Sequence, residues 1–292
     1  MRQQFRAQQT LACSVEVEGF GYWTGRDVKV RFRSAPANTG IVFVRADLPQ
    51  PKRISAIVER RIEMPRRTAL AADGATVEMV EHIMAALAGL NIDNCEVWVD
   101  GAEMPGLDGS AQAYVEALQS AGIVEQDAVR AQLIVDDVTR VGNDESWVEA
   151  RPVRTRCLQV RYRLDYGSES PIGRQTFEMR VTPDSFRKEL ASARTFILEA
   201  EADWLRKQGL GARVTFDDLL VFGDTGPCNN ALRFEDECVR HKALDLIGDL
   251  ALAGCDFVGQ IIAYRSGHRL NAELVKALLA EGQVLGGLRK SA

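Results

Sequence analysis

The sequence predicts an α+β fold with two similar domains, and a few features of the chain lead to that prediction. Strand patterns gather into groups that helical patterns follow, which differs from the strict strand–helix alternation of an α/β protein. The strand patterns begin again after residues 123–132, the expected boundary. Two helical segments also share Val-x-His and a glycine seven residues after the histidine, as a duplication would leave them. We therefore expect domains at residues 1–125 and 130–292.

The first half contains both kinds of pattern. Apolar residues that alternate or run together between turn residues predict strands, and a longer apolar period predicts helices. The expected strands are residues 13–19, 27–33, 41–48 and 95–101, and the expected helices are residues 76–90 and 111–122. Asp108 or Ser110 is the candidate N-cap of the second helix, and Gly122 is its expected end.

The second half repeats this succession. The expected strands are residues 130–141, 146–153, 157–166, 174–182 and 256–265, and the expected helices are residues 183–192, 199–209, 239–249 and 271–282. Each half thus holds sheet-forming and helical segments, as two α+β domains require.

Composition excludes several classes of function. The 292 residues are 46% hydrophobic and 26% charged, which is typical of a globular protein with one or two cores. A formal net charge of −5 argues against nucleic acid as a macromolecular partner. No uncharged apolar stretch reaches the ~18–20 residues that span a bilayer, so no transmembrane segment is expected. Residues 1–19 lack the apolar run of a signal peptide.

The cysteines indicate a reducing compartment. The six thiols are widely spaced and form no Cys-x-x-Cys pair, so neither a disulfide framework nor a cysteine zinc site is expected. Reduced, mostly buried thiols are typical of a cytoplasmic protein, and we expect that location.

Polar side chains mark one face of the helix predicted over residues 239–249. His241, Asp245 and Asp249 follow one another at four-residue steps, opposite an apolar stripe. Side chains four apart lie ~5–6 Å apart at Cβ, so an imidazole and a carboxylate in this relation can bind one metal ion. The solvated face of an ordinary amphipathic helix has the same pattern, so the helix alone leaves both interpretations open.

The chain has only three histidines, so a site with two imidazoles must draw on distant segments. His82 precedes a segment without charged residues, which we expect to be buried. His82 is therefore either a side chain of the core or a metal ligand. The adjacent Glu81 favours the ligand, because a buried carboxylate needs a cation or hydrogen bonds. His82, His241 and Asp245 form a plausible His₂Asp zinc set, and Glu81 can then act as general base on a water molecule.

The third histidine, His268, follows a predicted strand, where a loop can present it to a cleft. It is either a solvated turn residue or a cation that stabilises an oxyanion and protonates a leaving amine. Asp249, one turn beyond Asp245, can orient His268 and raise its pKa.

Long motifs connect these residues to a known family. They are VEHIMAALAGLNIDN, MPGLDGSA, ARTF, LRFEDECVRHKALDLIGDL and AYRSGHRLN, in this order along nearly the whole chain. On these motifs the chain resembles the UDP-3-O-acyl-N-acetylglucosamine deacetylases, the zinc amidases of lipid A biosynthesis.

The resemblance implies a fold and a role for each matching residue. It implies domains of one β-sheet and two helices each, with the helices sandwiched between the two sheets and the active site at the domain interface. The implied residues are His82, His241 and Asp245 as zinc ligands, Glu81 as general base, His268 as general acid with Asp249 beside it, Thr195 on the oxyanion, Phe196 against the substrate, and Lys242 and Arg265 at the sugar nucleotide. One Zn²⁺ per chain is expected, although Fe²⁺ suits the same ligands.

The chain departs from the family pattern at a few positions. Trp23 stands where a histidine is usual, and Ser146 stands where a lysine or arginine often faces the diphosphate. Arg213 and Val214 stand where a pair of glycines is usual near the acyl passage, and their bulk is expected to narrow or re-route it.

The expected reaction is zinc-dependent hydrolysis of the N-acetyl group of UDP-3-O-acyl-N-acetylglucosamine, giving UDP-3-O-acyl-glucosamine and acetate. One alternative is a paralogous zinc amidase that deacylates a different N-acyl sugar or amide, which the departures motivate. Another is a non-catalytic zinc-binding protein that acts by interaction, which predicts a missing catalytic group.

Overall fold

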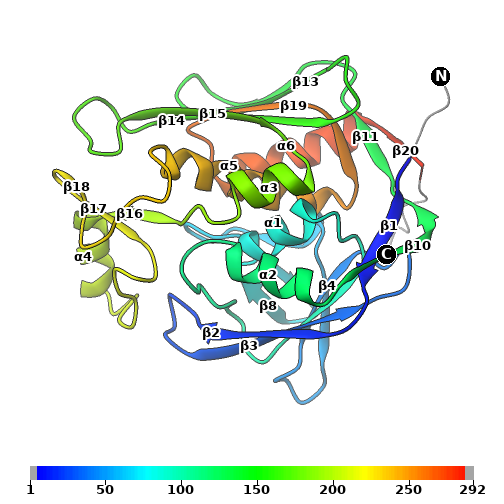
Figure 1. Cartoon of the computed structure of the whole chain (residues 1–292), viewed down its shortest axis with the longest axis horizontal. Helices are drawn as coiled ribbons and strands as arrows, with labels where there is room; N and C mark the ends of the chain where they lie inside the picture. The colour runs from blue at the N-terminus through cyan, green and yellow to red at the C-terminus, as the bar shows by residue number, and fades with distance from the viewer. Residues whose placement is uncertain (1–4, 287–292) are drawn as a thin grey trace.

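The computed structural model describes residues 5–286 and has the α+β architecture expected from the sequence. Helices form a central layer between two β-sheets, which lie above and below it in Figure 1. The outer ends of the two expected domains, residues 1–4 and 287–292, lie outside the described residues.

One sheet comes from the first half of the chain. Its strand order is β2-β3-β9-β4-β5, and β4 and β9 are the parallel pair. The strands are β2 Val15–Phe20, β3 Asp27–Ser34, β4 Ile41–Arg45, β5 Lys52–Ser55 and β9 Cys95–Val99. Along β3 buried and exposed residues alternate, so Val28, Val30 and Phe32 point into the core while the residues between them face water.

The other sheet comes from the second half. Its strands are β11 Gln132–Ile134, β12 Thr139–Gly142, β13 Trp147–Arg151, β14 Leu158–Asp165, β15 Arg174–Arg180, β19 Asp256–Tyr264 and β20 Gln283–Leu285. The central strand β19 pairs in parallel with β11 and β14 and antiparallel with β13. Its run of apolar residues is buried for most of its length, as a strand with neighbours on both sides requires.

The helices between the sheets carry the candidate site. They are α1 Glu81–Gly89, α2 Gln112–Ser120, α3 Pro183–Glu189, α5 Glu237–Leu250 and α6 His268–Glu281. Helices α1 and α5 cross closely at Gly248, where an added Cβ would collide with the carbonyl oxygen of Glu81. An added Cβ at Gly89 would collide with the ring of Phe186. The glycine shared by the two helical motifs is therefore explained by close packing in both places. No helix among residues 5–286 is long and apolar enough to cross a bilayer.

A small subdomain projects from one end of the layers, at the left of Figure 1. It consists of β16 Phe196–Leu198, α4 Glu199–Lys207, β17 Leu220–Gly223 and β18 Gly226–Pro227. We call residues 196–227 the insert. None of the residues of α4 is buried, so this helix lies on the surface of the second half.

Two further strand groups lie outside these sheets. Strands β6 Arg61–Ile62, β7 Ala69–Ala72 and β8 Ala75–Glu78 follow the short helix η1 Val58–Arg60 and form a small sheet. Near the beginning of the chain, β1 Ala7–Leu11 pairs antiparallel with β10 Ile123–Val129. Most of the expected boundary segment is therefore itself a strand.

Three local expectations were wrong. The helix expected over residues 76–90 begins only at Glu81, because residues 75–78 pair as β8 and Met79 has a positive φ of 58°. The helix expected from residue 271 begins at His268, so this histidine is not in a loop. Neither Asp108 nor Ser110 is the N-cap of α2, which is Ala111; Asp108 instead accepts hydrogen bonds from Ser110.

Candidate active site

Two helices from different halves of the chain bring the expected metal ligands together. One ligand atom from each of His82, His241 and Asp245 can be chosen so that all lie within 4.8 Å of one another. Oδ1 of Asp245 lies 3.7 Å from Nε2 of His82 and 3.3 Å from Nε2 of His241. The two imidazole rings are nearly perpendicular, with centroids 5.1 Å apart. Among residues 5–286 this is the one such group of histidine, cysteine and carboxylate side chains.

The hydrogen bonds of Asp245 leave one oxygen free. Oδ2 accepts a hydrogen bond from Nζ of Lys242 at 2.7 Å. Oδ1 is buried and has no hydrogen-bond partner within the described residues. A buried carboxylate oxygen without a donor is unfavourable, and a cation between Oδ1 and the two imidazoles removes the deficit. The donor set therefore fits a divalent metal ion.

The hydrogen bond of Nδ1 determines that Nε2 is the nitrogen of His241 that faces Asp245. Nδ1 of His241 lies 3.1 Å from the carbonyl oxygen of Ala193, to which it can only donate a hydrogen bond. In the neutral imidazole Nε2 then carries a lone pair, directed at the side of Asp245. An outer hydrogen bond of this kind is the usual way in which a protein orients a histidine ligand.

The protonation states also suit a cation. Burial lowers the pKa of His82 to about 3, helped by the neighbouring His241, and burial lowers the pKa of His241 as well. Burial by itself would raise the pKa of the Asp245 carboxyl, but His241 and Lys242 outweigh it and hold that pKa well below its usual range. At neutral pH the group therefore consists of neutral imidazoles and one carboxylate, the forms in which these side chains bind metals.

Glu81 is the first residue of α1 and lies beside His82. Its carboxylate is buried, and Oε2 accepts a hydrogen bond from the backbone N–H of Thr68 at 2.9 Å. Burial raises the pKa of Glu81 to about 7. A carboxylate with that pKa can both take and return a proton near neutral pH.

His268 and Asp249 form a largely buried pair that faces the same cavity as Glu81. Nδ1 of His268 lies 2.8 Å from Oδ2 of Asp249. Burial alone would lower the pKa of His268, but the charge and hydrogen bond of Asp249 outweigh burial and raise this pKa to about 9. His268 is therefore a cation at neutral pH, with its Nε2–H free to donate elsewhere.

Two residues that the sequence did not single out complete this pair. Thr68 donates a hydrogen bond from Oγ1 to Oδ1 of Asp249 at 2.6 Å, and Asn271 donates from Nδ2 to Oδ2 at 2.8 Å. Because the backbone of Thr68 also donates to Glu81, one buried residue holds both Glu81 and Asp249 in place. Thr68 lies just before β7, in a segment without a recognisable motif, and only the fold shows its position.

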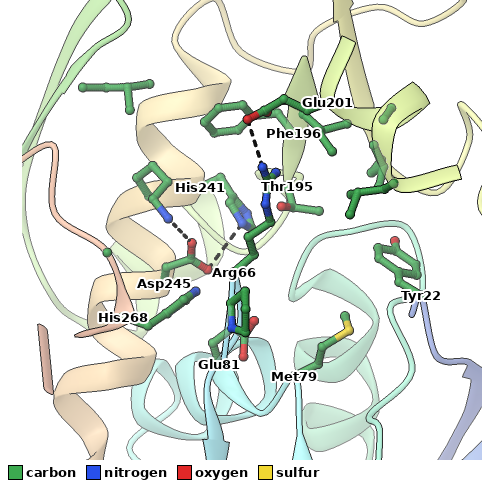
Figure 2. A pocket seen from close by; sticks show the side chains of 18 of the residues that line it. Tyr22, Arg66, Met79, Glu81, Thr195, Phe196, Glu201, His241, Asp245 and His268 are labelled. Carbon is green, nitrogen blue, oxygen red and sulfur yellow. Dashed lines mark hydrogen bonds and ion pairs between the residues drawn. The ribbon is translucent and has the colours of Figure 1, made fainter. Parts of the chain in front are cut away.

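A cavity of about 1130 Å³ opens onto this cluster and is lined by both halves of the chain. Figure 2 shows Glu81, His268, Asp245 and His241 together on one side, with Thr195 and Phe196 nearby. The hydroxyl of Thr195 has no hydrogen-bond partner among the described residues. The ring of Phe196 meets that of His241 edge-on, with centroids 6.4 Å apart. The structure therefore places all ten expected residues in or directly behind one cavity; Lys242 and Arg265 line it, and Asp249 lies behind His268.

Comparison with known proteins identifies the family. Residues 8–280 match the family model of UDP-3-O-acyl N-acetylglycosamine deacetylase. Similar curated proteins from Brucella ovis, Brucella canis and Brucella suis are named UDP-3-O-acyl-N-acetylglucosamine deacetylase. Each is 42% identical over 277 residues, which cover 94% of this chain and 96% of the relative. The chain belongs to this deacetylase family.

Membership in this family of metalloenzymes agrees with the geometry of the cluster. The mixed fold, with helices between two sheets, is likewise the fold expected for the deacetylase family. The structure also shows where the chain's departures from the deacetylase pattern lie.

Of the residues that depart from the family pattern, Trp23, Ser146 and Val214 line the cavity and Arg213 does not. Trp23 lies at the cavity, held by hydrogen bonding of its backbone to Glu103 and by the guanidinium of Arg67, 4.4 Å from its ring centroid. Ser146 also lines the cavity and donates a hydrogen bond to the carbonyl oxygen of Arg265. Val214 lines it as well.

The expectation that Arg213 and Val214 narrow or re-route an acyl passage stays a prediction. Arg213 is not part of the cavity wall, because its guanidinium pairs with Asp27 at 2.7 Å and stacks 4.3 Å from the ring centroid of Phe20. These partners lie on the β2–β3 hairpin, which draws the side chain away from the cavity. The insert instead presents a largely apolar wall, formed by Ile197, Leu205, Leu210, Val214, Leu219 and Val221.

Proposed function

We propose that this protein hydrolyses the N-acetyl group of UDP-3-O-acyl-N-acetylglucosamine, giving UDP-3-O-acyl-glucosamine and acetate, in lipid A biosynthesis. The relatives carry this activity in their names. The observation that carries the proposal most strongly is the buried, unpartnered Oδ1 of Asp245 between two imidazoles, flanked by Glu81 and His268. An amide hydrolase that uses a metal needs these groups at one point.

We propose that His82, His241 and Asp245 hold one Zn²⁺. Two imidazoles and one carboxylate with room for water are typical of a catalytic zinc site, and Fe²⁺ is the alternative that such ligands also accept. When bound, the metal supplies Lewis acidity, which polarises the amide carbonyl and lowers the pKa of water towards ~7.

Glu81 is the proposed general base. It accepts a proton from the water whose oxygen attacks the amide carbon. Its raised pKa of about 7 suits this step, because an acceptor is most effective when its pKa lies near the working pH. The backbone N–H of Thr68 holds the carboxylate in one orientation while this happens.

His268 is the proposed general acid. It is protonated at neutral pH through its pair with Asp249 and donates its proton to the amide nitrogen as the C–N bond breaks. The amine can then leave as a neutral group. Asp249 keeps the imidazole in the tautomer and direction that this transfer requires.

Thr195 and Phe196 complete the proposed reacting centre. The hydroxyl of Thr195 is available to donate a hydrogen bond to the oxygen that becomes negative during the attack, a contribution that is strongest away from water. Phe196 lies beside His241, where its ring can pack on the sugar and exclude solvent.

The cavity suits the rest of the substrate. We propose that Lys242 and Arg265 bind the sugar nucleotide, since both are cations that line the cavity. The apolar wall of the insert suits the 3-O-acyl chain, because burying each CH₂ group contributes about 0.8 kcal/mol.

Two broader expectations stay proposals. We propose that the chain divides into domains 1–125 and 130–292 with the site between them; ligands from α1 and α5 support this division. We also propose a cytoplasmic location, which the six free cysteines support.

Acetate release tests the proposed reaction. Metal-loaded protein should release acetate from UDP-3-O-acyl-N-acetylglucosamine, and much more slowly from plain UDP-N-acetylglucosamine, which lacks the chain that fits the apolar wall. Absence of acetate from the acylated sugar nucleotide would remove the proposal in favour of a different N-acyl substrate.

A further inference from the structure

Arg194 and Glu237 form a buried ion pair just outside the cavity. Their side chains are 5% and 0% exposed. Nε of Arg194 donates a hydrogen bond to Oε1 of Glu237 at 2.8 Å, and Nη2 donates to Oε2 at 3.1 Å. Neither residue is part of the cavity wall, so an influence of this pair on the reaction has to pass through its neighbours.

The hydrogen bonds of the pair are made within the protein. Each carboxylate oxygen of Glu237 also accepts a backbone N–H, Oε1 from Arg194 at 3.0 Å and Oε2 from Arg233 at 2.6 Å. The guanidinium donates further to Oδ1 of Asn230 at 3.0 Å and to the carbonyl oxygen of Ala231 at 2.7 Å. The pair therefore ties the chain around Arg194 to the segment that leads into α5.

Glu237 extends the polar face of α5 by one turn. It is the first residue of α5 and precedes His241 by four residues, the same step that separates His241 from Asp245. Residues four apart lie on one face of a helix. On the next turn, Nδ1 of His241 donates to the carbonyl oxygen of Ala193. Two successive turns of α5 thus hold two successive residues, Ala193 and Arg194.

Thr195 follows directly in the chain and lines the cavity. Its backbone N–H donates to the carbonyl oxygen of Gly109 at 2.7 Å, and its carbonyl oxygen accepts from the N–H of Leu220 at 3.0 Å. Figure 2 shows Thr195 and His241 close together beside the same cavity. We call residues 193–195 the brace. Because the brace is bonded to α5 on one side, the hydroxyl of Thr195 and the imidazole of His241 keep a fixed relation.

The energetics of a buried ion pair favour a role in positioning. Desolvation of two charges can exceed their attraction, so such a pair is weak evidence for a gain in stability. A guanidinium that binds both oxygens of one carboxylate does, however, fix the distance and the orientation of the two groups. A displacement of about 1 Å at a reacting centre can lower the rate ~10²-fold, so fixed positions matter there.

We propose that Arg194 and Glu237 are positioning residues that hold the brace against α5, so that the hydroxyl of Thr195 and Nε2 of His241 face one point. The part that concerns Thr195 rests on the proposed function. The part that concerns His241 rests on the metal cluster alone and passes through the carbonyl group of Ala193.

The test uses full-length variants. R194Q leaves the buried Glu237 without its cation, so it should unfold at a lower temperature than the wild type. R194Q/E237Q removes both charges and retains amide groups that can hydrogen-bond, so it is the main variant. R194K keeps the charge without the fork. R6Q is the matched control, because Arg6 pairs with Asp93 and Asp256 and is not part of the cavity wall.

Two quantities are measured on each variant. They are kcat and KM for acetate release at saturating Zn²⁺, and the Kd for Zn²⁺ from competition with a chromophoric chelator. R194Q/E237Q should lower kcat ~10–100-fold with KM little changed, and should raise the Kd for Zn²⁺ ~10–100-fold, as for other groups that orient a metal ligand. R194K should recover part of both losses. R6Q should leave both values within about twofold of the wild type, as expected for a pair that is not part of the cavity wall.

Coupling to Thr195 separates positioning from a general loss of stability. In a T195A background, R194Q/E237Q should lower kcat much less than it does in the wild type, because both changes act through the same hydroxyl group. Full additivity of the two changes would contradict the positioning of Thr195.

Distinct outcomes would overturn the inference. An active wild type together with an R194Q/E237Q variant that keeps the wild-type kcat or the wild-type Kd for Zn²⁺ contradicts it. Equal losses in R6Q show general destabilisation and also remove it. A wild type that releases no acetate overturns the proposed reaction instead. In that case a weaker Zn²⁺ affinity of R194Q/E237Q still supports the brace at His241, and an unchanged affinity removes it.

Discussion

The two walls of the cavity are held in different ways. In α5, 12 of the 14 residues are buried, including His241, Asp245 and Asp249. In α4, none of the nine residues is buried, and Trp204 is 58% exposed. Reacting groups and a substrate wall therefore meet different physical demands. Groups that exchange protons or bind a cation need fixed, desolvated positions, whereas an apolar wall needs only contact area.

Local charge stabilises α4 in place of a core. Glu199 and Glu201 lie in its first turn, and Arg206 and Lys207 lie in its last turn. These charges complement the helix dipole, a contribution of about 0.3–1 kcal/mol each. Substitutions around α1 and α5 should therefore change the chemistry strongly, and substitutions on α4 should change it little.

Loss of the proton acceptor has the largest expected effect. E81Q keeps an oxygen to accept the hydrogen bond from Thr68 but cannot take a proton from water. We expect kcat to fall ~10²–10⁴-fold, as is typical for a general base, with metal content unchanged. Acetate release and metal analysis on one preparation measure both. H241A is the reference variant and should lose the metal itself. Near-full activity of E81Q would show that another group is the base.

The Asp249–His268 pair predicts the alkaline limit of activity. His268 must be protonated to act as an acid, and Asp249 raises its pKa to about 9, so kcat/KM should fall as the pH rises through about 9. In D249N burial still lowers this pKa and the carboxylate no longer raises it. The decline should then begin at a pH lower than about 9, although Glu81 and Asp245 still raise this pKa. A pH profile that is the same in both proteins would exclude His268 as the acid.

Thr68 should have a smaller effect that passes through Asp249. T68V removes the hydroxyl donor to Asp249 and keeps the backbone donor to Glu81. We expect kcat to fall ~10–100-fold with KM little changed, as for other hydrogen bonds that orient a reacting group.

Rescue and coupling separate this role from simple loss of packing. T68S restores the hydroxyl and should recover most of the rate. In a D249N background, T68V should add little further loss, because the two substitutions break the same interaction. Full additivity, or a T68S variant as poor as T68V, would contradict a positioning role.

A substitution in the insert should have the smallest effect, and that effect is on the free energy of unfolding. Glu201 of α4 pairs with Arg66 at 3.0 Å, and the two side chains are 40% and 44% exposed. E201Q should lower the free energy of unfolding by only ~0.2–1 kcal/mol, measured by urea denaturation. A loss of about 3–5 kcal/mol, the range for a broken buried pair, would mean that the insert is held as firmly as the α1–α5 layer.

Helical spacing and the small number of histidines together suggested the proposed metal ligands. The four-residue step between His241 and Asp245 is a property of the helix alone, and the scarcity of histidine made His82 the natural partner. Spacing could not decide whether the polar face met water. Burial of α5 between other elements decides that, and burial depends on the whole fold.

Residues outside regular motifs could not be predicted. Thr68 lies 13 residues before Glu81 and 181 residues before Asp249, so only tertiary packing joins them. The start of α6 at His268 was missed because Gly267 lacks the capping side chain that marks most helix starts.

Metal titration coupled to acetate release tests whether the cluster of His82, His241 and Asp245 holds the metal on which activity depends. Metal-free protein is titrated with Zn²⁺, and the rate of acetate release from UDP-3-O-acyl-N-acetylglucosamine is measured at each addition. We expect no acetate release without metal, a linear rise in rate that ends at one equivalent of Zn²⁺ per chain, and no rise in H241A. Full activity of metal-free protein, or an unchanged response in H241A, would contradict it.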